Sequence, residues 1–383
     1  MISKQEKLLM HPLTQKLIEK INSHIDIINP PQQDYVTEYG ASDLANWDKI
    51  LTIYDMLDDD ESKKIFADVI ILRIAMMLFP LSTVKKHFSL FPTKEWDRLI
   101  SEAEKMEGLP GDYILDRVET WILKGYEYKK YKAKPGDIVI EGGCFTGNTT
   151  CYFANLVQRQ GKVYSFEPNP QIFSQLCENT KKYPQVIPIN SGISSHDDTA
   201  NITNSGAAST VVEKGDISIT LRSIDSFVKE NNISHVDFIK LDIEGCEQDA
   251  IDGAKETIRS NMPTIAICLY HRPDDIFNIP LKLNKLYSGY SFYIKHNSDI
   301  NYETVLFAIP QKNNRAECGN IYSDDIKIIS TFGNIISTIL KNKFSYKAIN
   351  MKDIIVIVTQ KLHIYNVIQP IYNTVKKVIR RFK

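Results

Sequence analysis

The stretch DIVIEGGCFTGNTT, residues 137–150, decides the fold class of this chain. It begins with a short apolar run typical of a buried strand, continues through a turn that contains Gly142, Gly143 and Gly147, and ends in residues that suit a helix. A glycine-rich turn lets the backbone approach a ligand closely, and the N–H groups of the following helix point toward that ligand. The stretch therefore predicts the first strand–turn–helix unit of a ligand-binding α/β domain.

The residues that follow repeat this alternation of short apolar runs and longer helical segments. Strands are predicted at residues 137–143, 162–167, 186–193, 236–243, 264–270, 291–296 and 304–309, and helices at 149–160, 171–182 and 247–260. A polar excursion over residues 194–214 and a further strand at 217–224 indicate an insertion. Seven strands plus an insertion predict a doubly wound α/β domain with a mostly parallel sheet.

Two flanking regions differ in pattern from this domain. Residues 1–130 show helical spacing and predict a helical accessory region, which leaves residues 131–310 as the α/β domain. Residues 311–383 form a C-terminal extension, in which residues 326–383 hold 11 Lys and Arg and one acid, a net charge of +10. Its last part, residues 364–383, predicts a basic amphipathic helix that either packs on its own domain or binds an anionic membrane surface or a partner.

Composition limits the class of protein. With 383 residues, 43% of them hydrophobic, the chain can bury a large core, which excludes global disorder and a small disulfide-stapled scaffold. The formal net charge of -1 provides no chain-wide basic field, so nucleic acid is not an expected partner. The six cysteines lack a C-x-x-C pair and predict neither a zinc site nor disulfides. Because residues 1–20 lack the apolar core of a signal peptide, we expect a cytoplasmic location, with peripheral contact at the inner membrane face if the basic helix binds there.

The glycine-rich turn departs from the dinucleotide fingerprint. That pattern requires G-x-G-x-x-G, whereas Gly143 and Gly147 are four positions apart and Cys144 stands where a glycine is needed. Glu141, at the mouth of the turn, would repel a pyrophosphate but attract a cation. The sulfonium and amino groups of S-adenosylmethionine are such cations, so Glu141 and the glycine-rich turn suit this cofactor.

Glu167 ends the second predicted strand and precedes Pro168-Asn169-Pro170. An acidic residue at this position hydrogen-bonds ribose hydroxyls in nucleoside-binding α/β folds. Glu167 is therefore a predicted cofactor-binding residue, although it suits nicotinamide dinucleotides as well as S-adenosylmethionine.

Acidic residues also follow the strand predicted at 236–243. Alternation places Lys240, Asp242 and Glu244 on one side of the chain, at the carboxyl edge of the sheet where such folds bind ligands. One interpretation is a Lys240–Asp242 ion pair, with Glu244 and Glu247 stabilised near a helix N-terminus. The other is that Asp242 and Glu244 orient an acceptor hydroxyl or a divalent cation, with His271, after the next strand, as the general base. His271 could equally be an ordinary surface histidine.

Four motifs in order resemble the FkbM-type methyltransferases, O-methyltransferases of the class I Rossmann-like fold that use S-adenosylmethionine. They are DIVIEGGCFTGNTT, KVYSFEPNP, SITLRSIDSF and VDFIKLDIEGCEQDAIDGA, and the resemblance covers residues 137–310. It implies cofactor roles for Glu141, Gly143, Gly147 and Glu167, and acidic-site roles for Asp242, Glu244 and Glu247. This sequence departs from the family pattern by having Glu141 in place of Asp, Cys144-Phe145 in place of Ala-Asn, and no acid within residues 265–270.

The resemblance implies a methyl acceptor that is a hydroxyl of a sugar, polysaccharide or polyketide. The predicted function is therefore an S-adenosylmethionine-dependent O-methyltransferase, in which His271 or Asp242 removes the acceptor proton. A non-catalytic or membrane-recruited scaffold that retains the fold, and a nicotinamide-dependent oxidoreductase, stay as alternatives. The sequence leaves open the acceptor, a divalent cation requirement and the oligomeric state.

Overall fold

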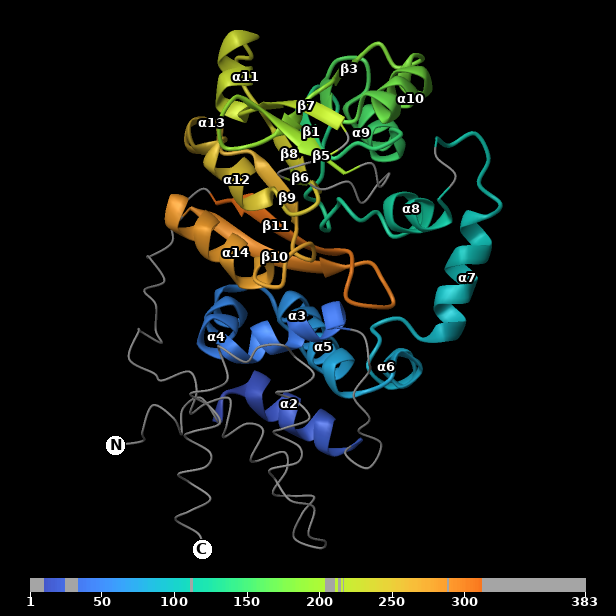
Figure 1. Ribbon diagram of the computed structural model, residues 1–383, viewed down its shortest axis with the longest axis vertical. Helices are drawn as coiled ribbons and strands as arrows, with labels where there is room; N and C mark the ends of the chain where they lie inside the picture. Colours follow the sequence, from blue (N-terminus) through green and yellow to red (C-terminus); the bar gives the residue numbers. More distant parts are fainter. Residues whose placement is uncertain are drawn as a thin grey trace, which may run out of the picture. The chain divides into compact units, whose positions relative to one another are not determined.

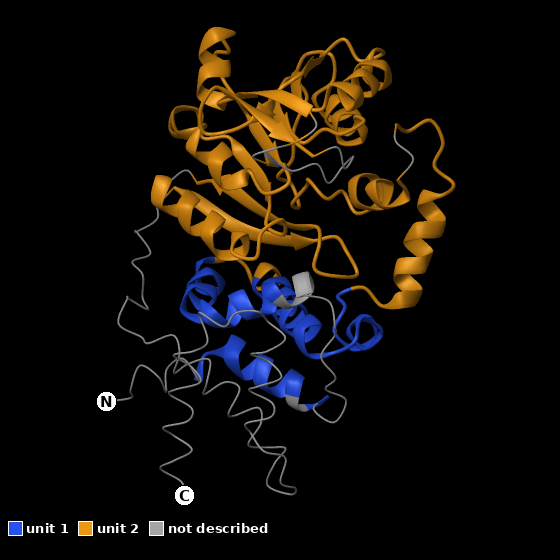
Figure 2. Ribbon diagram, in the orientation of Figure 1, with its two compact units in different colours: residues 1–56, 63–90, 318–383 blue, residues 57–62, 91–317 orange. Residues whose placement is uncertain are grey.

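The computed structural model describes residues 10–24, 34–110, 113–203, 211–212, 215, 217–287 and 289–311. The chain divides into two compact units, coloured in Figure 2. Described residues within 10–56 and 63–90 belong to the first unit, and residues 57–62 and those from Phe91 onward belong to the second. The predicted basic helix at 364–383 lies outside the described residues.

The first unit is helical, as predicted for the N-terminal region. Its helices are α2 (Pro12–Asn22), α3 (Asp34–Ala45), α4 (Trp47–Met56), α5 (Asp60–Leu78, whose first turn belongs to the second unit) and α6 (Leu81–His87). Arg73 and Asp43 form a fully buried ion pair, with 2.8 Å between Nε and Oδ2. Burial raises the pKa of Asp43 to about 7, although the Arg73 guanidinium opposes this shift. None of the described helices is both long and apolar enough to cross a bilayer.

The second unit contains the predicted seven-stranded sheet, in the order β10-β11-β9-β8-β1-β2-β3. Its strands are β1 (Ile138–Gly142), β2 (Lys162–Phe166), β3 (Val186–Ile189), β8 (Phe238–Leu241), β9 (Thr264–Cys268), β10 (Tyr290–His296) and β11 (Thr304–Pro310). The β11 strand runs antiparallel to β9 and β10, and the other pairs are parallel. This strand order confirms the predicted fold class. The strands could be predicted because those of such a sheet are near-continuous apolar runs, buried on both faces.

The predicted insertion forms a second, smaller sheet in the order β4-β7-β5-β6. Its strands are β4 (Gly192–Ile193), β5 (Asp198–Ile202), β6 (Val211–Val212) and β7 (Ile217–Arg222). The single strand predicted at 186–193 was therefore wrong, because the chain leaves the main sheet after Ile189 and pairs with β7 from Gly192. This transfer brings the small sheet next to the end of β2, where Gly192 lies close to Pro168.

Helices cover both faces of the main sheet. Figure 1 shows α9 (Asn148–Val157) and α10 (Pro170–Thr180) on one side and α12 (Glu247–Asp252), α13 (Lys255–Asn261) and α14 (Asp275–Leu286) on the other. The helix predicted at 247–260 is thus two helices, separated at Gly253, where a Cβ would lie 2.1 Å from the Ser194 carbonyl oxygen. The β2 strand lies on one side of β1 and β8 lies on the other side. The switch in strand order therefore falls between β1 and β8.

The segment from Phe91 to β1 also belongs to the second unit. It contains α7 (Thr93–Ala103), α8 (Ile114–Arg117) and the π-helical turn η2 (Val118–Ile122), whereas α11 (Ile224–Glu230) follows β7 much later in the chain. Trp96, Leu99, Ala103 and Val118 form its hydrophobic cluster. A short π-helical turn is frequently found at functional sites.

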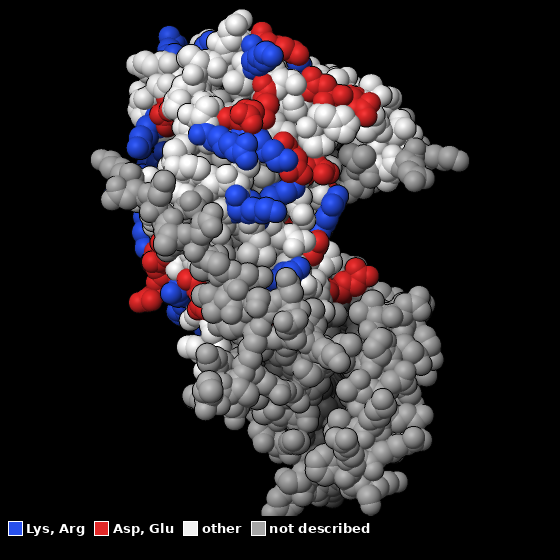
Figure 3. All heavy atoms as spheres, turned by 90° about the vertical axis from the view of Figure 1, so that its left-hand side faces the viewer, with Lys and Arg blue, Asp and Glu red and all other residues white. Residues whose placement is uncertain are grey.

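The outer face of α12–α14 carries charges of both signs. Figure 3, which views this side of the molecule, shows Lys and Arg interspersed with Asp and Glu on the described surface. Lys255 of α13 and Lys282 of α14 both pair with Asp252. The expectation that nucleic acid is not a partner stays a prediction.

Candidate functional site

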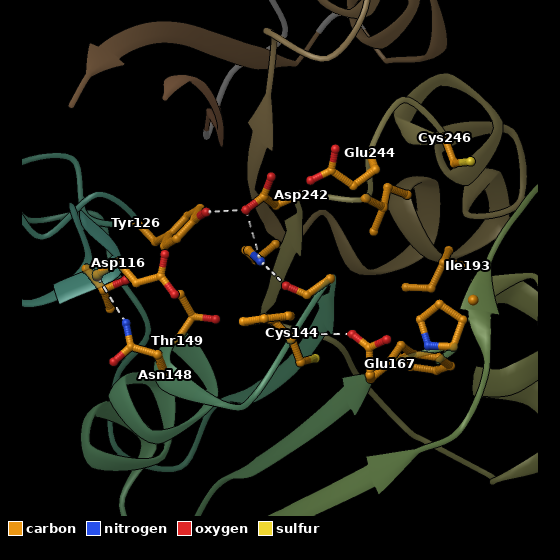
Figure 4. A pocket seen from close by; sticks show the side chains of 18 of the residues that line it. Asp116, Tyr126, Cys144, Asn148, Thr149, Glu167, Ile193, Asp242, Glu244 and Cys246 are labelled. Atoms are coloured by element: carbon orange, nitrogen blue, oxygen red, sulfur yellow. Dashed lines mark hydrogen bonds and ion pairs between the residues drawn. The ribbon is translucent and has the colours of Figure 1, made fainter. Parts of the chain in front are cut away.

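A cavity of about 270 Å³ opens where the carboxyl ends of β1, β2, β8 and β9 meet, at the switch in strand order. Gly143, Glu167, Asp242 and Tyr270, which follow these four strands, all line it. Figure 4 shows Glu167 and Ile193 on one side of the cavity, Asp116 and Tyr126 on the opposite side, and Asp242 between them. Ligands of open α/β sheets bind at such a switch point.

The loop after β1 is held against β8 by its backbone. Gly143 has φ +74°, and a Cβ at this position would lie 1.6 Å from the Asp242 carbonyl oxygen. The buried ammonium group of Lys240 donates to the carbonyl oxygens of Gly142 (3.1 Å) and Gly143 (2.7 Å). Only glycine fits at position 143, so the loop backbone can form one wall of the cavity.

Glu141 lies beneath this loop and does not line the cavity. Its fully buried carboxylate accepts hydrogen bonds from the hydroxyls of Thr149, Thr150 (2.7 Å) and Ser165 (3.0 Å). These bonds satisfy the charge inside the protein and connect β1, α9 and β2. This arrangement therefore does not support direct contact between Glu141 and a ligand in the cavity.

Gly147 also stays outside the cavity lining. It is the N-cap residue of α9 with φ +97°, and a Cβ here would lie 2.9 Å from the Leu176 side chain. Its place in the structure indicates a role in the turn and in packing against α10.

Glu167 lines the cavity at the end of β2, the position predicted from the sequence for a residue that binds ribose hydroxyls. Its carboxylate accepts hydrogen bonds from the backbone N–H groups of Phe145 (3.1 Å) and Asn169 (2.8 Å). Burial raises the pKa of Glu167 to about 7, although these two bonds oppose the shift. The loop after β1 is thus connected to the end of β2 through this carboxylate.

The cavity wall beside Glu167 is apolar. It is formed by Pro168 and by side chains of the small sheet and its connections, namely Ile193, Ile202, Ile219 and Leu221. An apolar slot next to an acidic residue suits a nucleoside, whose flat base is apolar on its faces and whose sugar carries hydroxyl donors.

Asp242 lies at the centre of the cavity. Its two carboxylate oxygens accept hydrogen bonds from the hydroxyls of Tyr126 (2.9 Å) and Tyr270 (2.9 Å). Its Oδ2 atom lies 3.5 Å from the Lys240 ammonium group. Burial alone would raise the pKa of Asp242, but Lys240, His271 and the two tyrosine hydroxyls lower it to about 2. The predicted Lys240–Asp242 ion pair is therefore present, and the carboxylate still faces the cavity.

His271 does not line the cavity, and the structure does not support its predicted role as general base. Its Nδ1 lies 2.7 Å from Glu247, and its Nε2 lies 3.3 Å from Asp242 and 3.7 Å from Glu244. Burial would lower the pKa of His271, but these carboxylates raise it to about 10. The imidazole is therefore protonated at neutral pH and connects three acidic residues.

Replacing His271 by Gln should remove this charge and destabilise the protein by about 1.5–3 kcal/mol at pH 6, the value of a hydrogen bond to a charged group. Because the folded-state pKa is raised from 6.5 to about 10, the stabilisation is complete below pH 6.5 and is lost as the pH rises through about 10. Denaturant unfolding of both proteins from about pH 6 to about pH 10 measures this difference. A difference that grew with pH would contradict the assignment.

Glu244 lines the cavity near Asp242. It is held in the left-handed region at φ +54°, a conformation that costs a non-glycine residue free energy and clusters at functional sites. Burial raises the pKa of Glu244 to about 7.

Sequence reasoning missed the residues opposite Glu167. Asp116 of α8 and Glu119 of η2 line the cavity from the segment before β1, and Asn297 and Glu303 line it from the β10–β11 loop. The acid that the family pattern places within residues 265–270 is absent there, and Glu303 lies instead in the loop between β10 and β11. Among the described residues, no group of His, Cys, Asp and Glu is arranged to hold a metal ion, so a divalent cation requirement gains no support.

The sheet order and the cavity at its switch point define a class I methyltransferase-like α/β fold. The family model described as "Methyltransferase FkbM domain" matches residues 136–340, which is more than half of the chain. The chain belongs to this family.

Known relatives share part of their length with this chain. The hexuronic acid methyltransferase AglP of Haloferax volcanii is 28% identical over 134 residues, which is 34% of this chain and 54% of the relative. The 2-O-methyltransferase NoeI of Sinorhizobium fredii is 23% identical over 147 residues, which is 33% of this chain and 60% of the relative. The match thus spans between half and two thirds of each relative.

A solved structure shares the fold. The methyltransferase FkbM of Methylobacillus flagellatus KT superimposes with a TM-score of 0.51 at 16% identity, covering 71% of this chain and 60% of that chain. At this identity the similarity supports the fold alone.

Proposed function

We propose that this protein is an S-adenosylmethionine-dependent O-methyltransferase that acts on a sugar or polysaccharide hydroxyl. The observation that carries the proposal is one cavity with an apolar, Glu167-containing end and an acidic end, with Asp242 between them. The family supports methyl transfer, the name of NoeI supports transfer to oxygen, and the name of AglP supports a sugar-derived acceptor.

The residues fit the chemistry of this cofactor. In our proposal the Glu167 carboxylate accepts hydrogen bonds from the ribose hydroxyls, and the apolar wall formed by Ile193 and its neighbours contacts adenine. The wall formed by Gly143 has no side chain that would keep a ligand away from the loop backbone. When bound, the cofactor would supply an electrophilic methyl group on a positively charged sulfur.

Asp242 is the proposed acceptor-binding residue. Its carboxylate has lone pairs left after accepting from Tyr126 and Tyr270, and it can orient the acceptor hydroxyl and take its proton as the oxygen–carbon bond forms. Because its pKa is low, we expect positioning to contribute more than base strength. The two tyrosines fix the direction of the carboxylate.

Calorimetric titration with S-adenosylmethionine, S-adenosylhomocysteine and NAD tests the cofactor. We expect binding of the first two, with loss of binding in Glu167→Ala. If a folded protein bound neither S-adenosylmethionine nor S-adenosylhomocysteine, a non-catalytic scaffold would be favoured. Binding of NAD alone would favour an oxidoreductase.

The affinity for S-adenosylhomocysteine should rise from about pH 6 to about pH 8, because ribose hydroxyls donate to the ionised form of Glu167, whose pKa is about 7. Glu244 and Glu303 also have pKa values raised into this range, so Glu167→Gln is the necessary comparison. Titrations across this range should show a smaller slope in the variant. An equal slope in both proteins would assign the pH dependence to another group.

A further inference from the structure

The acidic end of the cavity has its own set of residues, separate from those proposed to bind the cofactor. We define the acceptor subsite as Asp116, Glu119, Gly125, Asn297 and Glu303, all of which line the cavity. Two come from α8 and η2, one from the following loop, and two from the β10–β11 loop. This inference rests on the proposed function, because it concerns the molecule that would receive the methyl group.

Asn297 points to a ligand at this subsite. Its side chain is only 1% exposed, and neither its amide nitrogen nor its amide oxygen has a hydrogen-bond partner among the described residues. The nitrogen lies 3.2 Å from where a Cβ on Gly125 would stand. A buried amide without partners is unfavourable, so a bound polar molecule that supplies a donor and an acceptor would satisfy it.

The charge of the cavity favours a cation at this end. Six carboxyl groups line the cavity, those of Asp116, Glu119, Glu167, Asp242, Glu244 and Glu303. Among the described residues that line it, only Lys240 carries an ammonium group, and this group already binds two loop carbonyls and Asp242. S-adenosylmethionine would add a single net positive charge to a cavity in which these six carboxyl groups can ionise.

The acidic residues of the subsite have raised pKa values because they are buried close to one another. Burial raises the pKa of Asp116 to about 6 and that of Glu303 to about 8, and in both cases the nearby charge of Asp242 adds to the shift. Burial, followed by the charges of Glu303 and Asp116, raises the pKa of Glu119 well above its ordinary value. Lys240 lowers the pKa of Asp116, and Tyr270 and His271 lower that of Glu303, but these effects do not cancel the upward shifts. A bound organic cation would relieve this repulsion.

A metal ion is a poorer fit, because the described residues hold no group of ligands arranged for one. We propose that the acceptor subsite binds an ammonium group, so that the methyl acceptor is a hydroxyl of an amino sugar or a similar amino alcohol. The carboxyl groups of Glu119 and Glu303 receive the ammonium donors, and the Asn297 amide binds a neighbouring hydroxyl. A sugar with a carboxylate in this place is disfavoured by repulsion.

The test is binding of four probes to the full chain saturated with S-adenosylhomocysteine. The probes are the methyl glycosides of glucosamine, N-acetylglucosamine, glucose and glucuronic acid, with affinities measured by calorimetry. We expect the glucosamine probe to bind about 10- to 100-fold more tightly than the glucose and N-acetyl probes, as one hydrogen bond between charged groups allows. The glucuronic acid probe should bind most weakly.

Three variants assign this preference to the subsite. Glu303→Gln should reduce the preference for glucosamine over glucose about 10-fold, and Asn297→Ala should weaken both probes while preserving the preference. The matched control is Glu256→Gln, which removes an exposed carboxylate on α13. All variants should bind S-adenosylhomocysteine like the wild type, which shows that they are folded.

Equal or tighter binding of glucose or glucuronic acid, or no binding of the glucosamine probe to the saturated protein, would overturn the inference while leaving the proposed function intact. A preference for glucosamine that survived Glu303→Gln unchanged would remove the subsite as its cause. Failure of the wild type to bind S-adenosylhomocysteine would instead reject the proposed function, and this inference with it.

Discussion

Replacing Asp242 by Asn should lower kcat by about 10²–10⁴-fold, the contribution of a positioned acid–base group. The amide keeps the shape of the side chain but loses the negative charge that orients the acceptor hydroxyl and takes its proton. Methyl transfer to an accepted sugar, followed by release of S-adenosylhomocysteine, measures the loss. The affinity for S-adenosylhomocysteine should stay within a few-fold of the wild type, because the proposed cofactor contacts lie at Glu167 and the loop after β1.

Tyr126→Phe provides a comparison for the Asp242 variant. It removes one of the two hydroxyls that hold the Asp242 carboxylate but leaves the carboxylate in place. We expect a smaller loss of kcat than in Asp242→Asn, with partial retention of activity. Normal turnover of Asp242→Asn would remove Asp242 from the mechanism.

Replacing Gly143 by Ala should weaken cofactor binding by about 100-fold or more, because a displacement of about 1 Å in the loop that forms one wall of the cavity would misplace the bound ligand. The added Cβ would lie 1.6 Å from the Asp242 carbonyl oxygen, so either the loop or the end of β8 must move. Calorimetric titration with S-adenosylhomocysteine measures the effect, and thermal unfolding of the same sample shows how much of the protein is folded.

Gly136→Ala is the matched control for this experiment. Gly136 also has a positive φ, +94°, but a Cβ there has no neighbour within 4 Å. The control therefore loses about 1–2 kcal/mol of stability through backbone strain and should keep full affinity. If both variants bound the cofactor equally, the close approach of the loop to β8 would have no role in binding.

The main sheet could be predicted from the sequence because its information is local. Each strand is a short apolar run bounded by turn residues, and the loop after β1 and Glu167 follow directly from the strands that carry them. The break at Gly253 was missed because its cause, a contact with the Ser194 carbonyl, comes from a distant segment.

The site was predictable only in part for the same reason. The position of Asp242 follows from its strand, whereas the charge of His271 depends on Glu244 and Glu247 of the preceding loop and helix being folded around it. Asp116 and Glu119 precede the first strand, and Asn297 and Glu303 follow the sixth strand of the main sheet along the chain. Their convergence depends on strand order and on the path of two loops, neither of which leaves a pattern in the sequence.

The β10–β11 loop is closed on itself, since the Asn297 N–H donates to the Glu303 carbonyl oxygen at 3.0 Å and His296 pairs with Thr304 across the hairpin. Its ends are therefore held in place by the hairpin. New loop sequences could be grafted between His296 and Thr304 without disturbing the strands that carry Glu167 and Asp242. In a hairpin of this kind the loop sequence can change while the strands stay the same. Related proteins could therefore differ in the acceptor that they modify while keeping the same cofactor.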